Sequence, residues 1–142
     1  MAKYTLNLEN DFNFDLIGVC SHSADYKVCW SINEQMGFRL TKAEESFIIS
    51  GKGGTIASAH SLYEWFDAEE NVNYYLIQNI DRERNKYLIP EKEQIDFFLI
   101  SKESGWVDVD KIVSDLKQIA CILTAVVIDV ESLKSAPKLL FD

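Results

Sequence analysis

Proline and glycine are scarce in this chain: its 142 residues include two prolines and six glycines. Linkers and disordered tails are typically rich in these residues, so the composition argues against both. A chain of this length fits one domain and buries roughly two thirds of the surface that its unfolded form exposes. We therefore expect a single folded domain that spans residues 1–142.

Cysteines are also few and odd in number: Cys20, Cys29 and Cys121. Such a set favours reduced thiols, as in cytoplasmic proteins, over a disulfide framework. The longest apolar candidate for a membrane span, residues 119–130, is too short to cross a bilayer. Residues 1–10 lack the continuous apolar core of a signal peptide. The sequence thus predicts a soluble, cytoplasmic protein with no membrane partner.

Basic residues are outnumbered, 14 against 23 acidic ones, which gives a net charge of −9. A negative protein repels phosphate backbones, so nucleic-acid binding would require a local basic patch. The only cluster of basic residues is Arg82, Arg84 and Lys86, and Asp81 and Glu83 interrupt it. We interpret this cluster as a solvated charged turn and expect no nucleic-acid partner.

The apolar residues form several short strand patterns. In residues 95–100, odd-numbered Ile, Phe and Leu alternate with even-numbered Asp, Phe and Ile, so both faces are mostly apolar. This pattern indicates a central strand that is covered on both sides. Residues 47–50 and 58–67 read as a hairpin around a glycine-rich turn. Further strands are expected at residues 4–8, 38–40, 72–78, 87–89 and 124–130, the last as a buried strand, and residues 14–20 are expected as either a strand or an extended lead-in.

Two helices are predicted by apolar residues at helical spacing. The first covers residues 24–36, and Gly37 is well placed to end it. The second begins after Asp108 or Asp110 and continues to Leu123 along a clear apolar stripe. Because turns rather than helices join most consecutive strands, we expect an α+β fold, a mostly antiparallel sheet with the two main helices packed on one face.

One short motif resembles a family signature. Ile89-Pro90-Glu91 is followed, after three residues, by Ile95-Asp96-Phe97. This spacing is similar to the signature of the bacterial IPExxxVDY family, with Ile95 in place of Val and Phe97 in place of Tyr. The resemblance implies a single domain over most of the chain, but it supplies no mechanism. A tyrosine hydroxyl at position 97 cannot be essential here, because that residue is Phe97.

The two acids of the motif, Glu91 and Asp96, admit two interpretations. As a functional pair, they would perform acid–base chemistry or bind a hard metal ion. As structural residues, Glu91 would accept hydrogen bonds from loop amides after Pro90, and Asp96 would accept one from a Tyr, a Trp or the backbone inside the sheet. We favour the structural interpretation, because structural networks are the commoner source of such acids.

Aromatic side chains are frequent, at 12% of the residues. Most are explained by packing in a core, but Tyr63, Trp65, Tyr74 and Tyr75 lie on neighbouring predicted strands. We expect some of them to face away from the core and to form a surface for a protein partner or for a homodimer.

Three other groups of residues are weak candidates for a site. Cys20, His22, Cys29 and His60 have ligand chemistry suitable for zinc, but their spacing matches no closed metal site. A Cys–His nucleophilic pair has no supporting pattern either. In residues 50–55 a glycine follows Lys52 and a strand is expected next, so the segment indicates a hairpin tip rather than a phosphate loop. We therefore expect no metal and no cofactor.

Taken together, these patterns favour a non-enzymatic interaction or structural domain. The alternative is a small-molecule-binding domain or a weak enzyme that uses Glu91 and Asp96 beside an aromatic pocket. The two hypotheses make different structural predictions. A deep pocket that contains both acids would favour the alternative, whereas a filled core with an exposed partner surface would favour the interaction domain.

Overall fold

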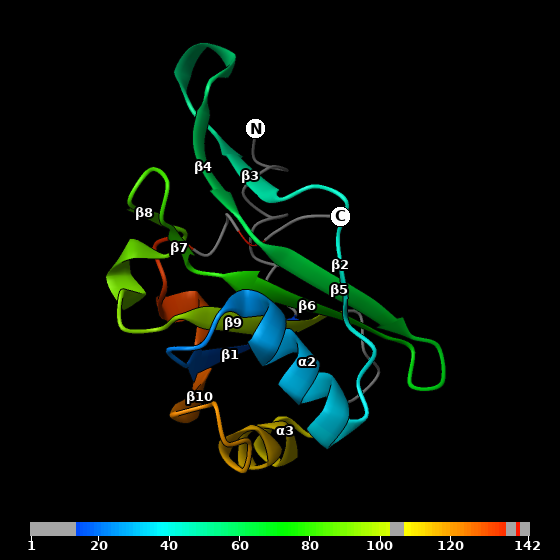
Figure 1. The fold of residues 1–142 in the computed structure, drawn as a ribbon. Helices are drawn as coiled ribbons and strands as arrows, with labels where there is room; N and C mark the ends of the chain where they lie inside the picture. The colour runs from blue at the N-terminus through cyan, green and yellow to red at the C-terminus, as the bar shows by residue number, and fades with distance from the viewer. Residues whose placement is uncertain (1–13, 103–106, 136–138, 140–142) are drawn as a thin grey trace.

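A computed structural model of the chain describes residues 14–102, 107–135 and 139 (Figure 1). The described part is an α+β domain, as the sequence predicts. Its α-helices are α2 (Asp25–Met36) and α3 (Val109–Lys117). Its strands are β1 (Phe14–Cys20), β2 (Thr41–Lys42), β3 (Phe47–Ser50), β4 (Ile56–His60), β5 (Leu62–Asp67), β6 (Val72–Gln78), β7 (Ile80–Asp81), β8 (Lys86–Tyr87), β9 (Phe97–Lys102) and β10 (Thr124–Ile128). The strand predicted at residues 4–8 lies outside the described residues.

The main sheet has six strands in the order β10-β1-β9-β6-β5-β2, and every neighbouring pair is antiparallel. β9, the strand at the end of the motif, lies between β1 and β6, so the predicted central position is confirmed. Two hairpins, β3–β4 and β7–β8, form small sheets of their own. The β3–β4 hairpin projects from the main sheet, as Figure 1 shows.

The main sheet is covered on both faces. Helices α2 and α3 both lie over one face (Figure 1), where Val28, Ile32 and Leu116 pack against Phe97 and Leu99. The opposite face is covered by loop and C-terminal residues, which pack against Phe98 and Ile100; they are Leu88, Ile89, Ile95, Val130, Leu133 and Leu139. The prediction of two helices on one face is therefore confirmed, and the apolar alternation of β9 explains why both layers form.

Both helices end or begin with the signals that the sequence contains. Gly37 has a φ of 72° and donates its N–H to Asn33 O, which closes α2 in a left-handed cap. Asp108 accepts a hydrogen bond from Lys111 N at 3.1 Å and caps α3. The N-terminus of α2 has Ala24 as its cap residue, with no hydrogen bond from a capping side chain.

Several predicted boundaries are wrong. Residues 38–40 are not a strand; the short β2 follows them. The strand predicted at residues 58–67 is divided at Ser61, because β4 pairs with β3 while β5 belongs to the main sheet. α3 ends at Lys117, six residues before the predicted end at Leu123, in a turn where Gln118 and Ile119 donate to Asp115 O and Leu116 O. No helix in residues 14–102 or 107–135 is long and apolar enough to cross a membrane.

Candidate functional site

The motif forms a compact turn that leads into the central strand. Residues 90–92 are a single turn of 3₁₀ helix, and Ile95 N donates to Lys92 O at 3.0 Å. Because this turn continues to Ile95, the strand starts at Phe97 rather than at the predicted residue 95. Ile95 consequently packs on the same face as Phe98 and Ile100, not on the predicted face of Phe97.

Asn79 holds this turn from the end of β6. It is fully buried, and its side-chain Oδ1 accepts from Ile89 N at 2.9 Å. Its Nδ2 donates to Lys92 O at 3.0 Å and to Ile95 O at 2.8 Å. Its backbone N–H and C=O bind Asp96 O and Leu88 N. Sequence reasoning missed this residue, because one Asn at the end of an apolar run carries no signal of its distant partners.

Asp96 lies immediately before β9, not in the middle of the strand, and it is half-buried. Its Oδ2 accepts a hydrogen bond from Ser21 N at 2.8 Å, and its own N–H donates to Val19 O. The donor is thus a backbone amide directly after β1, one of the kinds of donor that the sequence predicts, and not a Tyr or Trp side chain. Asp96 connects the motif turn to the segment between β1 and α2, which agrees with a structural role.

Replacing Asp96 by alanine should lower the free energy of unfolding by roughly 1–3 kcal/mol, because the Ser21 amide loses its acceptor. Asp96→Asn should cost less, since the single donor needs one oxygen. Urea unfolding measures both changes, with Glu93→Ala as a control in the same turn at an exposed acid. Equal midpoints for Asp96→Ala and wild type would show that this carboxylate does not support the fold.

Glu91 also binds within the chain. Its Oε2 accepts from Ser135 N at 2.8 Å and its Oε1 from the Ser135 hydroxyl at 3.0 Å. Burial is the largest single influence on Glu91 and raises its pKa, but the hydrogen bonds from Ser135 and neighbouring amides together outweigh it and hold the pKa below its ordinary value. Glu91 therefore fastens the C-terminal segment to the motif turn; the amides that it binds are not those of the loop after Pro90.

Glu91 and Asp96 do not meet at a cleft in the described part of the chain. The two carboxylates accept hydrogen bonds from different segments, Glu91 from Ser135 and Asp96 from Ser21. Five clefts along residues 14–102 and 107–135, with volumes from about 290 to about 670 Å³, have neither acid in their lining. The geometry therefore gives no support to acid–base chemistry by this pair.

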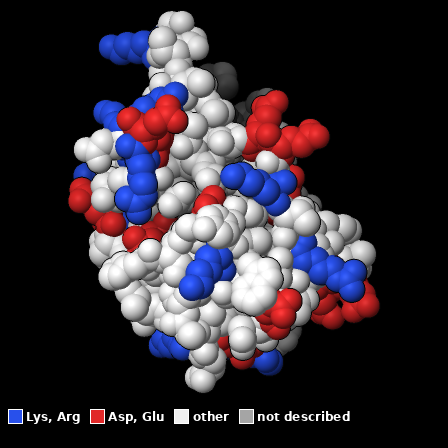
Figure 2. All heavy atoms as spheres, viewed as in Figure 1, with Lys and Arg blue, Asp and Glu red and all other residues white. Residues whose placement is uncertain are grey.

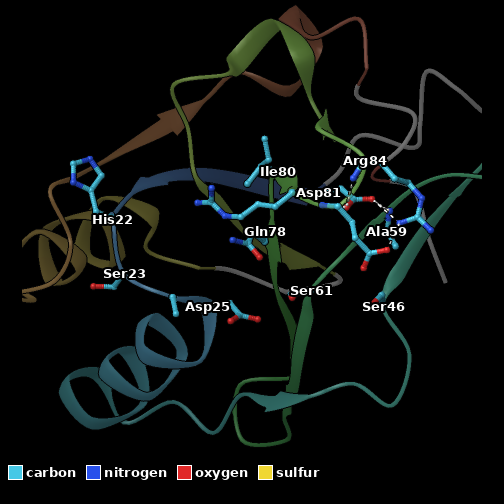
Figure 3. Close-up of a pocket in the computed structure, with 13 residues that line it drawn as sticks. His22, Ser23, Asp25, Ser46, Ala59, Ser61, Gln78, Ile80, Asp81 and Arg84 are labelled. Atoms are coloured by element: carbon cyan, nitrogen blue, oxygen red, sulfur yellow. Dashed lines mark hydrogen bonds and ion pairs between the residues drawn. The ribbon is translucent and has the colours of Figure 1, made fainter.

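A polar cleft of about 670 Å³ opens between the start of α2, the β4–β5 junction and the β7–β8 hairpin (Figure 3). On the hairpin side, buried Asp81 accepts from Ala59 N at 2.8 Å, from the amides of Glu83 and Arg84, and from Arg84 Nη1 at 3.0 Å. Burial alone would raise the pKa of Asp81, but these donors outweigh it and keep the pKa below its ordinary value. Asp81 thereby joins the two hairpins.

On the opposite side of this cleft, Asp25 accepts from the hydroxyl of Tyr63 at 3.1 Å. Burial alone would raise the pKa of Asp25, but the hydrogen bonds from the hydroxyls of Ser61 and Tyr63 and from the Tyr26 backbone outweigh it. The pKa is therefore below its ordinary value, and the carboxylate is ionised at neutral pH. Asp25 and Asp81 are thus already bonded within the fold, and the third carboxylate of the lining, Glu83, lies 3.9 Å from Arg84 Nη1. The remaining lining includes Ser23, Ser46 and Gln78, which offer hydrogen bonds to water or to a small polar molecule.

The aromatic residues proposed for a partner surface are mainly internal. Tyr63 and Tyr74 are 6% exposed and belong to the helix-side core, so the prediction that they face a partner is wrong. Trp65 is half-buried and stacks on Tyr74 with ring centroids 5.4 Å apart. Tyr75 is half-buried against the opposite core. The prediction failed because the two helices and Phe38 cover this part of the sheet, and residue type does not reveal that cover.

The weaker candidates are not assembled into a site. Among the described residues, no group of three His, Cys, Asp or Glu is placed to hold a metal ion. Burial, followed by the charge of Asp25, raises the pKa of Cys29 to about 11, so it is a thiol at neutral pH. Residues 51–55 form the tip of the β3–β4 hairpin, where the Thr55 hydroxyl donates to Lys52 O; the hairpin-tip interpretation is confirmed.

An exposed apolar edge is a feature that sequence reasoning did not identify. β10 was predicted as a buried strand, but it lies at one edge of the main sheet, and consecutive Val126 and Val127 are 43% and 54% exposed. Leu123, directly before it, is 62% exposed. In Figure 2 charges of both signs are interspersed over the visible face, whereas β10 itself, Thr-Ala-Val-Val-Ile, carries no charged residue.

Comparisons of the chain with models of protein families, with curated proteins and with solved structures give no match. The resemblance of residues 89–97 to the IPExxxVDY signature therefore stays a prediction. The fold and the surface of the described residues are what can support a functional proposal.

Proposed function

We propose that this protein is a non-enzymatic interaction domain that self-associates as a homodimer through the edge strand β10. The proposal is supported by the use of both motif acids within the fold and by the filled cores on both faces of the sheet. The observation that carries it is the exposed, uncharged surface of β10.

The two edges of the main sheet differ in the features that prevent association. An open edge presents unpaired N–H and C=O groups, and natural proteins usually protect it with short strands, charges or proline. β2 is such a protected edge: it has two residues, and one of them is Lys42. β10 has five residues, Thr-Ala-Val-Val-Ile, without a charge or a proline. β10 is therefore the edge that supports pairing with another strand.

The exposed side chains of β10 also fit a protein interface. Val126 and Val127 point to opposite faces of the sheet, and both are exposed, so neither face of the edge is fully covered by the described residues. The other large exposed apolar residues of the described chain are on α2, the β3–β4 hairpin and β5; they are Tyr26, Trp30, Ile48, Ile56 and Phe66. None of these residues lies on an edge strand of the main sheet.

Sedimentation velocity of three proteins tests this proposal. Wild type should be a dimer at micromolar concentration, and Val127→Lys should raise the dissociation constant at least about tenfold, because a lysine on the edge must be desolvated on pairing. Ile56→Lys is the matched control: Ile56 is 47% exposed on β4, and its replacement should leave the dimer intact. A wild type that is monomeric at high micromolar concentration would contradict the proposal. So would an equal increase of the dissociation constant in Val127→Lys and Ile56→Lys.

The compartment and the excluded partners belong to the same proposal. A cytoplasmic location is supported by Cys20, Cys29 and Cys121, which are free in the structure. The net charge of −9 supports a protein partner rather than a nucleic acid. Membership of the bacterial IPExxxVDY family is supported only by the residues and the spacing of the motif, Ile89-Pro90-Glu91 and Ile95-Asp96-Phe97.

A further inference from the structure

We propose that β10 pairs antiparallel with β10 of a second copy, in a register centred on Val126, so that the two main sheets continue across the interface. This inference rests on the proposed function and specifies its geometry. It assigns Val126 to the twofold axis and predicts which residues meet. The inference comes from the faces of β10, its length and the charges next to it.

The cores on the two faces of the sheet restrict the register. Ala125 packs in the helix-side core, and Ile128 packs in the opposite core. In a homodimer with a continuous sheet, the twofold axis is perpendicular to the sheet, so the helices of both copies lie on the same side. Two residues that pair across the axis must then have their side chains on the same face. Because side chains alternate between the faces, the twofold axis must pass beside one residue of each strand, not between two consecutive residues. All five residues of β10 are paired only when that centre is Val126.

The charge that flanks β10 disfavours registers whose centre is shifted toward the C-terminal end of the strand. Asp129 follows the strand directly, and each copy carries a net charge of −9. With Val126 at the centre, the two Asp129 residues lie at opposite ends, roughly 20 Å apart at about 3.4 Å per residue, which is beyond the Debye length of ~8 Å. A centre on Ile128 would bring them to diagonal positions about 7–8 Å apart, and it would pair fewer residues.

The cross-strand pairs in this register are complementary. On the helix side, exposed Val127 would lie opposite the small Ala125 of the partner subunit. On the other face, Val126 would meet its own counterpart, and Thr124 would lie opposite Ile128 of the partner subunit. Pairs of β-branched side chains are favourable in antiparallel sheets, and this set places no charge opposite another. The strand is therefore complementary to a second copy of itself.

Disulfide cross-linking tests the register. Residues directly opposite each other have Cα atoms about 4.5–5.5 Å apart, within the range of a disulfide. Val126→Cys should therefore form a covalent dimer rapidly under mild oxidation, as seen on a non-reducing gel. Val127→Cys is the matched control: two copies of residue 127 would be about 7–8 Å apart, too far for an unstrained disulfide. Wild type gives the background from the three native cysteines.

A second pair of variants addresses the case in which Val126→Cys does not fold. Val126→Lys and Val126→Glu should each raise the dissociation constant at least about tenfold, since like charges meet at the axis. An equimolar mixture of the two should regain the dimer, because lysine then meets glutamate. Suppose that wild type is a dimer and Val127→Lys disrupts it, but Val126→Cys does not cross-link and the mixture of Val126→Lys and Val126→Glu does not regain the dimer. This result would overturn the register and leave the proposed function intact. A monomeric wild type would overturn both.

Discussion

Replacing Asn79 by alanine should lower the free energy of unfolding by roughly 3–4 kcal/mol, a large effect for one polar residue. The Asn79 side chain is 0% exposed and makes three hydrogen bonds to the motif turn. Alanine would leave the N–H of Ile89 and the carbonyl of Ile95 without these buried partners, and the Lys92 carbonyl would keep only its hydrogen bond from Ile95 N. Urea unfolding at neutral pH measures the loss.

Asn73→Ala is the matched control for this experiment. Asn73 lies on the same strand, β6, but it is half-buried and opposite Phe66, so its replacement should change stability by only about 0.5 kcal/mol. Hydrogen exchange adds a local measurement. Relative to wild type, Asn79→Ala should increase the exchange rates of the amides in residues 89–96 more than those of the amides in β9. Equal midpoints for the two alanine variants would contradict the role of Asn79 as the support of the motif turn.

Replacing Asp81 by alanine should cost about 2–3 kcal/mol at neutral pH. Asp81 is 5% exposed, and it accepts four hydrogen bonds that join β4, the β7–β8 turn and Arg84. Without the carboxylate, the Ala59 amide loses its partner, and the two hairpins lose their connection. Asp67→Ala is the matched control, because Asp67 also accepts two turn amides but is at an exposed turn.

The loss in Asp81→Ala should depend on pH. The pKa of Asp81 is held below its ordinary value of 3.8, so the unfolded chain binds the proton more readily than the folded chain. The stabilisation is therefore complete above about pH 4–5 and disappears as the pH falls through the folded pKa. The difference in unfolding free energy between wild type and Asp81→Ala should shrink in this acid range. A difference that is the same at neutral and strongly acid pH would exclude an ionic contribution.

The fold class and most elements could be predicted because their signals are local. Apolar residues at helical spacing indicated α2 and α3, and Gly37 and Asp108 indicated an end and a start. Alternation in residues 95–100 indicated a central, doubly covered strand, which β9 is. Element ends were less accurate, because turns such as that at Gln118 and Ile119 depend on a few backbone bonds rather than on periodicity.

The candidate site was predicted only in part. The sequence singled out Glu91 and Asp96, and the structure gives both acids specific partners, but the partners were not predictable. Asn79 and Asp81 were missed because a single polar residue near a strand end has no distinctive pattern. Tyr63 and Tyr74 were expected at the surface, although helices from another part of the chain bury them.

The sequence by itself therefore determined the α+β class, the helices, the hairpin tip and the central strand, since each depends on neighbours within a few residues. Only the tertiary structure decided the strand order, the burial of the tyrosines and the exposed edge β10. These features depend on residues far apart in the chain: Ser21 and Asp96 are separated by 75 positions, and Glu91 and Ser135 by 44. Local periodicity records which face of a strand is apolar, but not which strand or helix covers it.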